Sequence, residues 1–204
     1  MTDDREREVL DRIGRGEFYT ETDAGFLSPQ RRSDLIFSYN QTLPSDWDRR
    51  RELLSAILGS VGRDPVLFSP FHAAFGGNVH IGDDFFGNVN LTLVDDVEIR
   101  IGHGVMIAPS VTLTTTGHPI HPELRTDFRR FSEPIVVEDR VWIGSNAVVL
   151  PGVRIGYGSV IGAGSVVTRD IPPMSVAVGS PARVIREITD ADLRARVAPG
   201  VEES

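Results

Sequence analysis

Aliphatic residues recur at every sixth position over a large part of the chain. From residue 137 onward the first position of each block is β-branched, at Val137, Ile143, Val149, Ile155, Ile161 and Val167. The period is also present earlier, at Phe75, Ile81, Gly87 and Leu93, and then at Ile101, Ile107 and Leu113. A six-residue period fits neither a helix nor a simple alternating strand. It predicts short strands separated by tight corners, with the first position of every block facing inward.

Glycine occupies the second position of several blocks, at Gly144, Gly156 and Gly162. Glycine suits corners in which the backbone adopts a positive φ or passes close to a neighbouring coil. A β-sandwich with accidental spacing is the alternative, but the consecutive matches to one period favour a solenoid. We therefore predict an all-β solenoid, although topology rules alone would favour right-handed crossovers between parallel strands.

The open ends of a solenoid need capping elements, because unpaired strand edges invite further pairing. We expect residues 1–62 to form an N-terminal helical cap and residues 63–184 to form the solenoid. Residues 185–204 would then be a C-terminal tail, with weak helical character from Arg186 onward.

Two helices are expected within the N-terminal cap. A charged helix should run over residues 3–13. A second helix begins at a capping box, with Ser45 as the N-cap and Asp48 at the third helical position, and should end at Gly59. Its apolar side chains form one stripe that would pack on the first coils; they are Leu53, Leu54, Ile57 and Leu58.

One segment interrupts the period, from about residue 115 to residue 134, and reads TTGHPIHPELRTDFRRFSEP. It is polar, contains proline and has no clear repeat. Long irregular segments of compact folds are usually functional or disordered. Because regular repeats flank it on both sides, we predict a protruding functional loop, which is called the excursion below.

Composition narrows the range of functions. The chain has 204 residues, a net charge of −8 and a pI of about 5.1, so a broad basic face for nucleic acid is not expected. A few arginines can still hold an anionic ligand. Cysteine is absent, which excludes disulfides, thiolate metal sites and a cysteine acyl-enzyme. The charged N-terminus does not read as a signal peptide and no apolar run reaches membrane-spanning length, so we expect a cytoplasmic enzyme.

Several motifs together resemble the maltose and galactoside O-acetyltransferases, a family of hexapeptide-repeat enzymes. The motifs are RIGRGEFY, NVHIGDDFFGNVNLTLVDDVEIRIG, TGHP, PIVVEDRVWIGS, PGVRIG, SVIGAGSVVTRDIP and GSPARVIREI, spread over about residues 11–190. The resemblance implies a left-handed parallel β-helix with three six-residue sides per coil. It also implies a homotrimer with sites between neighbouring subunits, acetyl-CoA as co-substrate, a sugar hydroxyl as acceptor and no metal.

An alcohol attacks well only when its proton is removed, and a histidine can remove it near neutral pH. His118, at the start of the excursion, matches the general base of the family. Ser145 matches the residue whose backbone N–H stabilises the oxyanion. Trp142 occupies an outward position of the repeat, and we expect it to line the acyl channel on the substrate side, the trimer interface, or both.

The resemblance also assigns the acceptor side of the site. Asn88 and Asp96 match residues that position the sugar, and Glu21 matches an aspartate of relatives, although Asp23 competes for that position. Ala74 stands where relatives carry a small polar or acidic residue, and it cannot accept a hydrogen bond from a sugar hydroxyl. The identity of the sugar and of the acetylated hydroxyl is therefore left open.

Coenzyme A requires a long groove for pantetheine and positive charge for its phosphates. Ala163 and Thr168 match positions whose backbone amides line that groove in the family. Arg169, Arg183 and Arg186 are the candidate phosphate ligands, because the guanidinium group makes bidentate contacts with phosphate.

Two other functions compete at the level of sequence. A noncatalytic trimeric assembly protein could use the same scaffold. A carbonic anhydrase-like zinc enzyme would need His80, His103 and either His118 or His121 to converge on one metal, and their spacing is irregular. An amine acceptor is a variant of the acetyltransferase hypothesis, since the same base could deprotonate an ammonium group.

Overall fold

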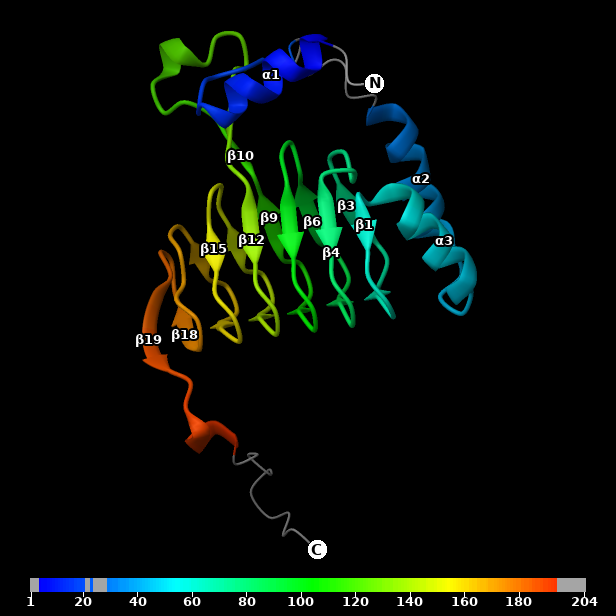
Figure 1. The fold of residues 1–204 in the computed structure, drawn as a ribbon, viewed down its shortest axis with the longest axis vertical. Helices are drawn as coiled ribbons and strands as arrows, with labels where there is room; N and C mark the ends of the chain where they lie inside the picture. Colours follow the sequence, from blue (N-terminus) through cyan, green and yellow to red (C-terminus); the bar gives the residue numbers. More distant parts are fainter. Residues whose placement is uncertain (1–3, 21–22, 24–28, 194–204) are drawn as a thin grey trace, which may run out of the picture.

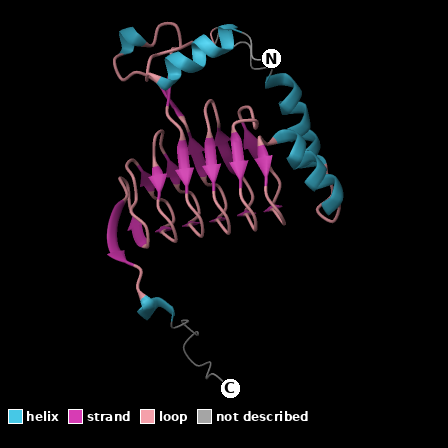
Figure 2. Ribbon diagram, in the orientation of Figure 1, coloured by secondary structure: helices cyan, strands magenta, loops and turns pink. Residues whose placement is uncertain are grey.

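The computed structural model describes residues 4–20, 23 and 29–193. Its main body is a solenoid of short parallel strands arranged in three sides, as Figures 1 and 2 show. The first side contains β1 (Ser60–Val61), β4 (Val79–Ile81), β7 (Ile99–Ile101), β12 (Ile135–Val137) and β15 (Arg154–Ile155). The second side contains β2 (Val66–Leu67), β5 (Phe86–Gly87), β8 (Met106–Ile107), β13 (Trp142–Ile143), β16 (Val160–Ile161) and β18 (Ser175–Val178). The third side contains β3 (Phe71–Ala73), β6 (Leu91–Val94), β9 (Thr112–Thr114), β14 (Val148–Val149) and β17 (Val166–Val167).

Inward-facing aliphatic side chains fill the solenoid. On the first side Ile81, Ile101, Val137 and Ile155 are successive partners along the stack, and all four are buried. Burying one aliphatic side chain of this size contributes roughly 1.5–3 kcal/mol to stability. From Ile81 onward the first positions of the blocks on the other two sides are also buried, so the predicted inward phase is confirmed there. The prediction is wrong for Phe75, which is half-buried beyond the end of β3, because Ala73 is the residue that pairs with Leu93.

The coils differ in length at one corner. Partners on the first side lie 20 residues apart between Ile81 and Ile101, 36 apart between Ile101 and Val137, and 18 apart between Val137 and Ile155. The second and third sides shift by the same amounts, so the register of the sheets is preserved. The extra residues leave the stack between the third side and the next first side, and the longest departure there is the excursion.

Two helices cover the first coil. α2 (Pro29–Gln41) and α3 (Trp47–Ile57) pack together and lie at the end of the solenoid that begins with β1 (Figure 1). The apolar stripe of α3 is buried as predicted. The prediction that Ser45 is the N-cap is wrong, because Asp46 holds that position and its carboxylate accepts the backbone N–H of Arg49 at 3.2 Å. A carboxylate also favours the positive end of the helix dipole, which explains why the aspartate outcompetes the neighbouring serine.

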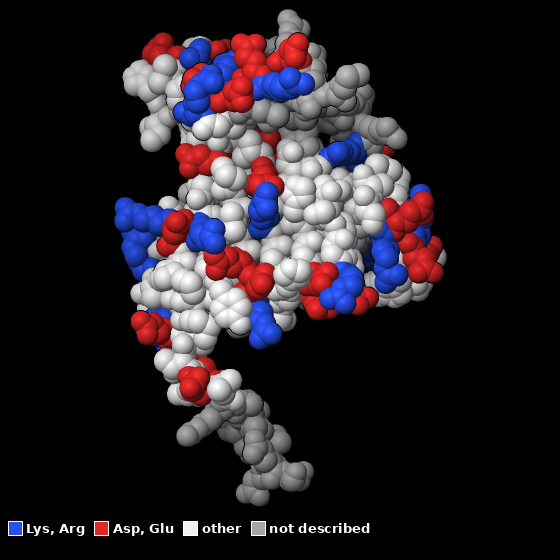
Figure 3. Space-filling view, viewed as in Figure 1, with Lys and Arg blue, Asp and Glu red and all other residues white. Residues whose placement is uncertain are grey.

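A third helix, α1 (Asp4–Gly14), lies beside the excursion and confirms the charged helix expected there (Figure 1). Figure 3 shows basic and acidic side chains gathered over it, while the part of the solenoid below carries fewer charges. Within the described part of the chain, none of the helices is both long enough and apolar enough to cross a bilayer.

The C-terminal end of the solenoid closes with a reversed strand. β19 (Arg183–Glu187) pairs antiparallel with β18, so the weak helical character expected from Arg186 is wrong at this point. β19 forms backbone hydrogen bonds with the open edge of the last coil, and these hydrogen bonds outweigh a weak local preference for helix. A short 3-10 helix, η2 (Asp190–Leu193), follows. The left-handed sense of the coil stays a prediction that rests on the family resemblance.

Candidate active site

The excursion leaves the solenoid as a two-stranded stem. β10 (Thr116–Gly117) pairs antiparallel with β11 (Phe131–Ser132), and the 3-10 helix η1 (Pro122–Leu124) lies between them in sequence. The segment after α1 joins the stem, because the backbones of Tyr19 and Arg130 exchange hydrogen bonds of 3.0 and 2.8 Å. The N-terminal segment and the excursion therefore form one small antiparallel unit.

His118 directly follows β10 and is exposed. Its Nδ1 atom lies 2.9 Å from the carbonyl oxygen of Arg129. A carbonyl oxygen can only accept a hydrogen bond, so Nδ1 carries a proton, and in the neutral ring the lone pair is on Nε2. The arrangement leaves Nε2 able to accept a proton from a bound molecule.

A buried polar cluster lies at the base of the stem. The Tyr19 hydroxyl donates to Asp96 Oδ2 at 3.0 Å and lies 2.6 Å from Ser132 Oγ, and Arg130 Nη1 donates to the same Asp96 oxygen at 2.8 Å. The Asp96 side chain is only 5% exposed. Burial raises the pKa of its carboxyl and outweighs the opposite effect of the Tyr19 hydrogen bond, and burial also raises the pKa of Tyr19 to about 12. Asp96, predicted as a sugar ligand, thus already has two partners within its own chain.

The neighbouring Asp95 has a different environment. It is fully buried, and its carboxylate accepts backbone N–H groups from Phe75 at 2.9 Å and Asn78 at 3.3 Å in the preceding coil. Burial raises the pKa of Asp95 to about 6, despite those hydrogen bonds. Asp95 therefore holds the corner together, while Asp96 joins the corner to the excursion.

Tyr19, Ser132 and Arg130 belong to this cluster but were not predicted from the sequence. Tyr19 and Asp96 are 77 positions apart, so no local pattern connects them. Only the RIGRGEFY element, which contains Tyr19, pointed toward this part of the chain. Glu21, predicted on the acceptor side, lies outside the described residues. Ala74 lies at the same corner of the solenoid as Asp96, one coil before it, and the excursion leaves from the coil after Asp96.

Other predicted residues lie on a different edge of the solenoid, between the second and third sides. Ser145 and Ala163 occupy adjacent coils there, since the backbone N–H of Gly164 donates to the Ser145 carbonyl at 2.8 Å. A Cβ on Gly144 would lie 2.6 Å from the Ala163 nitrogen, so this corner requires glycine. Asn88 is on the same edge in an earlier coil, and its Oδ1 accepts the N–H of the next residue at 2.8 Å.

This edge presents unused backbone donors. Among the described residues, no acceptor contacts the backbone N–H of Ser145 or that of Ala163. Thr168, at the end of the third side, likewise has no acceptor for its backbone N–H within the described structure. Free N–H groups of this kind can bind an oxyanion or the amide oxygens of an extended ligand. Trp142 lies next to them on the outer face of the second side and is 51% exposed.

The candidate phosphate ligands differ in how free they are. Arg186 Nη1 donates to Asp192 Oδ2 at 2.9 Å, and this hydrogen bond raises the pKa of Arg186. Arg183 donates to the Ala182 carbonyl at 2.8 Å. In the part of the chain that the structure describes, neither Arg183 nor Arg169 has a carboxylate partner. These two arginines are therefore better placed than Arg186 to meet a phosphate.

Within the described residues, no hydrogen bond or ion pair connects the His118 unit with the edge that carries Ser145. The two groups lie on different corners of the prism, with the third side between them. One chain by itself thus presents the candidate base and the candidate oxyanion donor on separate edges.

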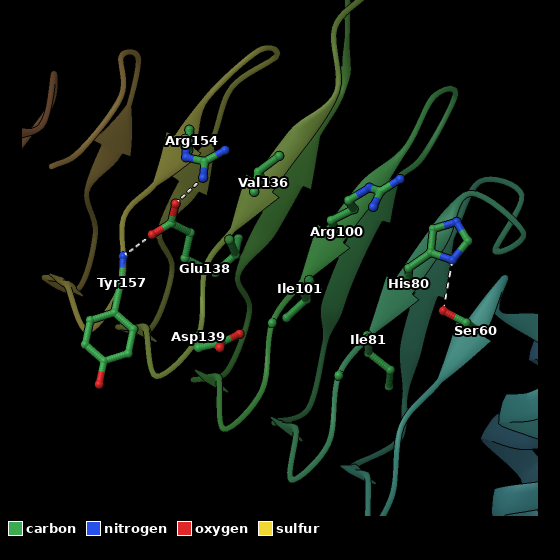
Figure 4. Close-up of a pocket in the computed structure, with 13 residues that line it drawn as sticks. Ser60, His80, Ile81, Arg100, Ile101, Val136, Glu138, Asp139, Arg154 and Tyr157 are labelled. Atoms are coloured by element: carbon green, nitrogen blue, oxygen red, sulfur yellow. Dashed lines mark hydrogen bonds and ion pairs between the residues drawn. The ribbon is translucent and has the colours of Figure 1, made fainter. Parts of the chain in front are cut away.

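A hollow of about 490 Å³ lies on the outer face of the first side and contains none of the predicted site residues (Figure 4). Its charged groups already have partners: Arg154 contacts Glu138, which also accepts the N–H of Tyr157 at 2.6 Å, and Ser60 contacts His80 at 2.9 Å. No set of three His, Asp or Glu residues among the described ones is close enough to hold a metal ion. This hollow is not the candidate active site.

Comparison with known proteins places these features in context. Residues 134–169 match the family profile described as hexapeptide repeat of succinyl-transferase. The chain is 46% identical over 185 residues to a galactoside O-acetyltransferase of Escherichia coli K12, covering 90% of this chain and 91% of that protein. A solved galactoside acetyltransferase in complex with coenzyme A has a TM-score of 0.89 at 42% identity, covering 96% of this chain and 98% of that one. A maltose O-acetyltransferase of Clostridium difficile 630 has a TM-score of 0.83 at 37% identity, with 88% and 96% covered.

Proposed function

The chain belongs to the galactoside and maltose O-acetyltransferase family, and on that premise we propose that it transfers acetyl from acetyl-CoA to a hydroxyl of a sugar acceptor. The observation that carries the proposal is the contact between His118 Nδ1 and the Arg129 carbonyl. With Nδ1 donating to this carbonyl, the neutral imidazole has its lone pair on Nε2, where it can accept the acceptor proton.

In the proposed reaction His118 Nε2 takes the proton of the acceptor hydroxyl while the hydroxyl oxygen attacks the thioester carbonyl. The free backbone N–H of Ser145 donates to the oxyanion that develops on the carbonyl oxygen. The carbon–sulfur bond then breaks, and the coenzyme A sulfur takes the proton back from His118. The products are the acetylated sugar and free coenzyme A, and the base returns to its starting state.

Acetyl-CoA is proposed to lie along the edge between the second and third sides and to extend toward the last coil. The unused N–H groups of Ala163 and Thr168 suit the amide oxygens of pantetheine. Arg169 and Arg183 would bind phosphate groups directly. Arg186 would first have to exchange its contact with Asp192 for a phosphate.

A homotrimer would bring the two separate edges together, with His118 of one protomer facing Ser145 of the next. An apolar row on the outer face of the second side, exposed at its centre and half-buried elsewhere, supports this arrangement. Its members are successive outward partners along the stack, namely Phe86, Met106, Trp142, Val160 and Val176. Met106 and Trp142 are each 51% exposed in the single chain, and such a row usually marks a protein interface.

On the acceptor side, Asn88, Trp142 and Glu21 are proposed to contact the sugar. Asp96 would act with them at the side of the site that carries His118, either directly or by holding Tyr19 and Arg130 in place. Ala74 removes one hydrogen bond from the acceptor pocket, so the preferred sugar would differ from that of relatives with a polar residue there.

A thiol-release assay with acetyl-CoA and a panel of sugars, amino sugars and simple amines tests the proposal. We expect acceptor-dependent release of coenzyme A with at least one sugar and an ester rather than an amide product. A noncatalytic scaffold would bind without releasing thiol. Amide formation alone would replace the hydroxyl acceptor with an amine, and hydration of carbon dioxide by metal-loaded protein would favour the zinc alternative.

A further inference from the structure

The peptide unit between Arg129 and Arg130 makes two hydrogen bonds, one at each end. Its carbonyl oxygen lies 2.9 Å from His118 Nδ1. Its N–H, which belongs to Arg130, donates to the Tyr19 carbonyl at 2.8 Å. The two bonds form a chain from the N-terminal segment through one peptide unit to the histidine, and hydrogen bonds in such a chain polarise one another.

The residues before this peptide unit form a tight turn that is held by hydrogen bonds between Asp127 and Arg129. Asp127 Oδ1 accepts the Arg129 backbone N–H at 3.2 Å and Arg129 Nε at 2.8 Å, while Asp127 Oδ2 accepts Arg129 Nη2 at 2.7 Å. The Arg129 side chain hence folds back on the turn instead of reaching outward. The Phe128 N–H donates to the Arg125 carbonyl at 3.2 Å.

Phe128 lies in the left-handed region, with a φ of 58°, although its ring is exposed. A bulky residue in this region is unusual and is strained, so its surroundings must hold it there. The contacts between Asp127 and Arg129, which flank Phe128, close the turn around it together with the hydrogen bond from the Phe128 N–H to the Arg125 carbonyl. This turn, together with the hydrogen bond from the Arg130 N–H to the Tyr19 carbonyl, sets the direction of the Arg129 carbonyl.

We propose that the Asp127–Arg129 pair is a positioning device for the catalytic base: it fixes the turn that presents the Arg129 carbonyl to His118 Nδ1, and so selects the tautomer with a free Nε2. The inference rests on the proposed role of His118 as base. Asp127 touches neither substrate nor the reacting atoms, so it acts only through the carbonyl and the histidine. Because exposed ion pairs contribute little to global stability, losing this pair should change the turn while leaving the fold as a whole intact.

The test compares Asp127→Ala with two matched variants. Asp127→Asn keeps an acceptor for the Arg129 N–H, and Glu123→Gln removes a carboxylate charge from another exposed position of the excursion. We expect Asp127→Ala to lower kcat about tenfold with the KM for acetyl-CoA unchanged, less than the loss of the base itself would cause. Asp127→Asn should recover most of kcat, and Glu123→Gln should behave like the parent enzyme.

The tautomer itself can be measured without turnover, from the imidazole nitrogen shifts of protein labelled with ¹⁵N-histidine. The His118 signals are assigned by their loss in His118→Ala. The parent should show the Nδ1–H form, and Asp127→Ala should populate the Nε2–H form. An unchanged tautomer, or a kcat loss no larger than in Glu123→Gln, would overturn the proposal. Full turnover by His118→Ala would instead overturn the assigned base, and the nitrogen shifts would still report on the turn.

Discussion

His118 and Arg129 lie at opposite ends of the excursion, and their side chain and backbone meet at a distance of 2.9 Å. The loop between them is polar and irregular in sequence, yet this contact gives the histidine a defined tautomer. A lone exposed histidine in water has no such preference imposed on it. The excursion thus supplies both the candidate base and the group that orients it.

Replacing His118 with asparagine should abolish nearly all activity. Asparagine can still donate an N–H toward the Arg129 carbonyl, but it cannot accept the proton of the acceptor hydroxyl. We expect kcat to fall about 10²- to 10⁴-fold, the range for loss of a general base. Thiol release gives the rate, and calorimetric titration should show unchanged binding of coenzyme A. Turnover near the parent rate would show that another group removes the proton.

Tyr19→Phe should destabilise the unit formed by the N-terminal segment and the excursion. The substitution removes the donor to Asp96 and the contact with Ser132, and leaves a buried carboxylate with one partner fewer. We expect a loss of about 1–3 kcal/mol in the free energy of unfolding. Tyr157→Phe is the matched control, because its hydroxyl has no hydrogen bond within the described structure and the residue is 41% exposed. Equal effects of the two substitutions in urea unfolding would contradict the importance of the cluster.

The stability of the protein should fall as pH rises from about 4 to about 6, because burial raises the pKa of Asp95 to about 6. In this window the folded state holds a proton that the unfolded chain has released, so raising the pH favours unfolding. Protonation of Asp95 stabilises the folded state by roughly 3 kcal/mol. This stabilisation is fully present below the pKa that Asp95 has in the unfolded chain. The raised pKa of Asp96 acts in the same direction.

Asp95→Asn should flatten this part of the pH profile of the melting temperature. Asp83→Asn is a suitable control, since the hydrogen bond from Arg63 lowers the pKa of Asp83 and its effect has the opposite sign. A slope that survives in Asp95→Asn would assign the pH dependence to another group.

Phe128→Gly should stabilise the protein by about 1 kcal/mol, because glycine adopts a positive φ without the steric cost of a side chain. The ring is 75% exposed, so little packing is lost. Phe128→Ala separates the two effects, since it removes the ring but keeps the Cβ. Thermal unfolding should rank glycine above alanine, and a higher stability of the alanine variant would show that the backbone at this position is unstrained.

Met106→Arg should disrupt the proposed trimer. The charge would lie at the exposed centre of the apolar row, between Phe86 and Trp142, and would have to be desolvated in an interface. Val136→Arg places the same charge on the outer face of the first side as a control. Sedimentation analysis should show a trimer for the parent and the control but smaller species for Met106→Arg. A trimer in all three proteins would show that the second side is not part of the interface.

The sequence predicted the solenoid because the six-residue period states directly which residues face inward, and Val137 and Ile143 are buried as that phase requires. The sequence does not distinguish between Ser45 and Asp46 as the N-cap of α3, because both residue types suit that position and only the folded backbone selects one of them. Family motifs proposed His118 and Ser145 as site residues but gave no role to Tyr19 or Arg130. The contact between Tyr19 and Asp96 depends on how distant segments meet, which no short-range pattern encodes.

The corner between the third and the first side explains how this fold can change function without changing its core. Every extra residue leaves and rejoins the stack there, and the partners on all three sides remain aligned whether a coil uses 18, 20 or 36 residues. Folding of the solenoid is therefore insulated from the length of that loop. A designer could exchange the whole excursion for a loop of different length and chemistry, and evolution has the same freedom: the stretch that carries His118 and the carbonyl beside it can diverge without altering the packing of the core.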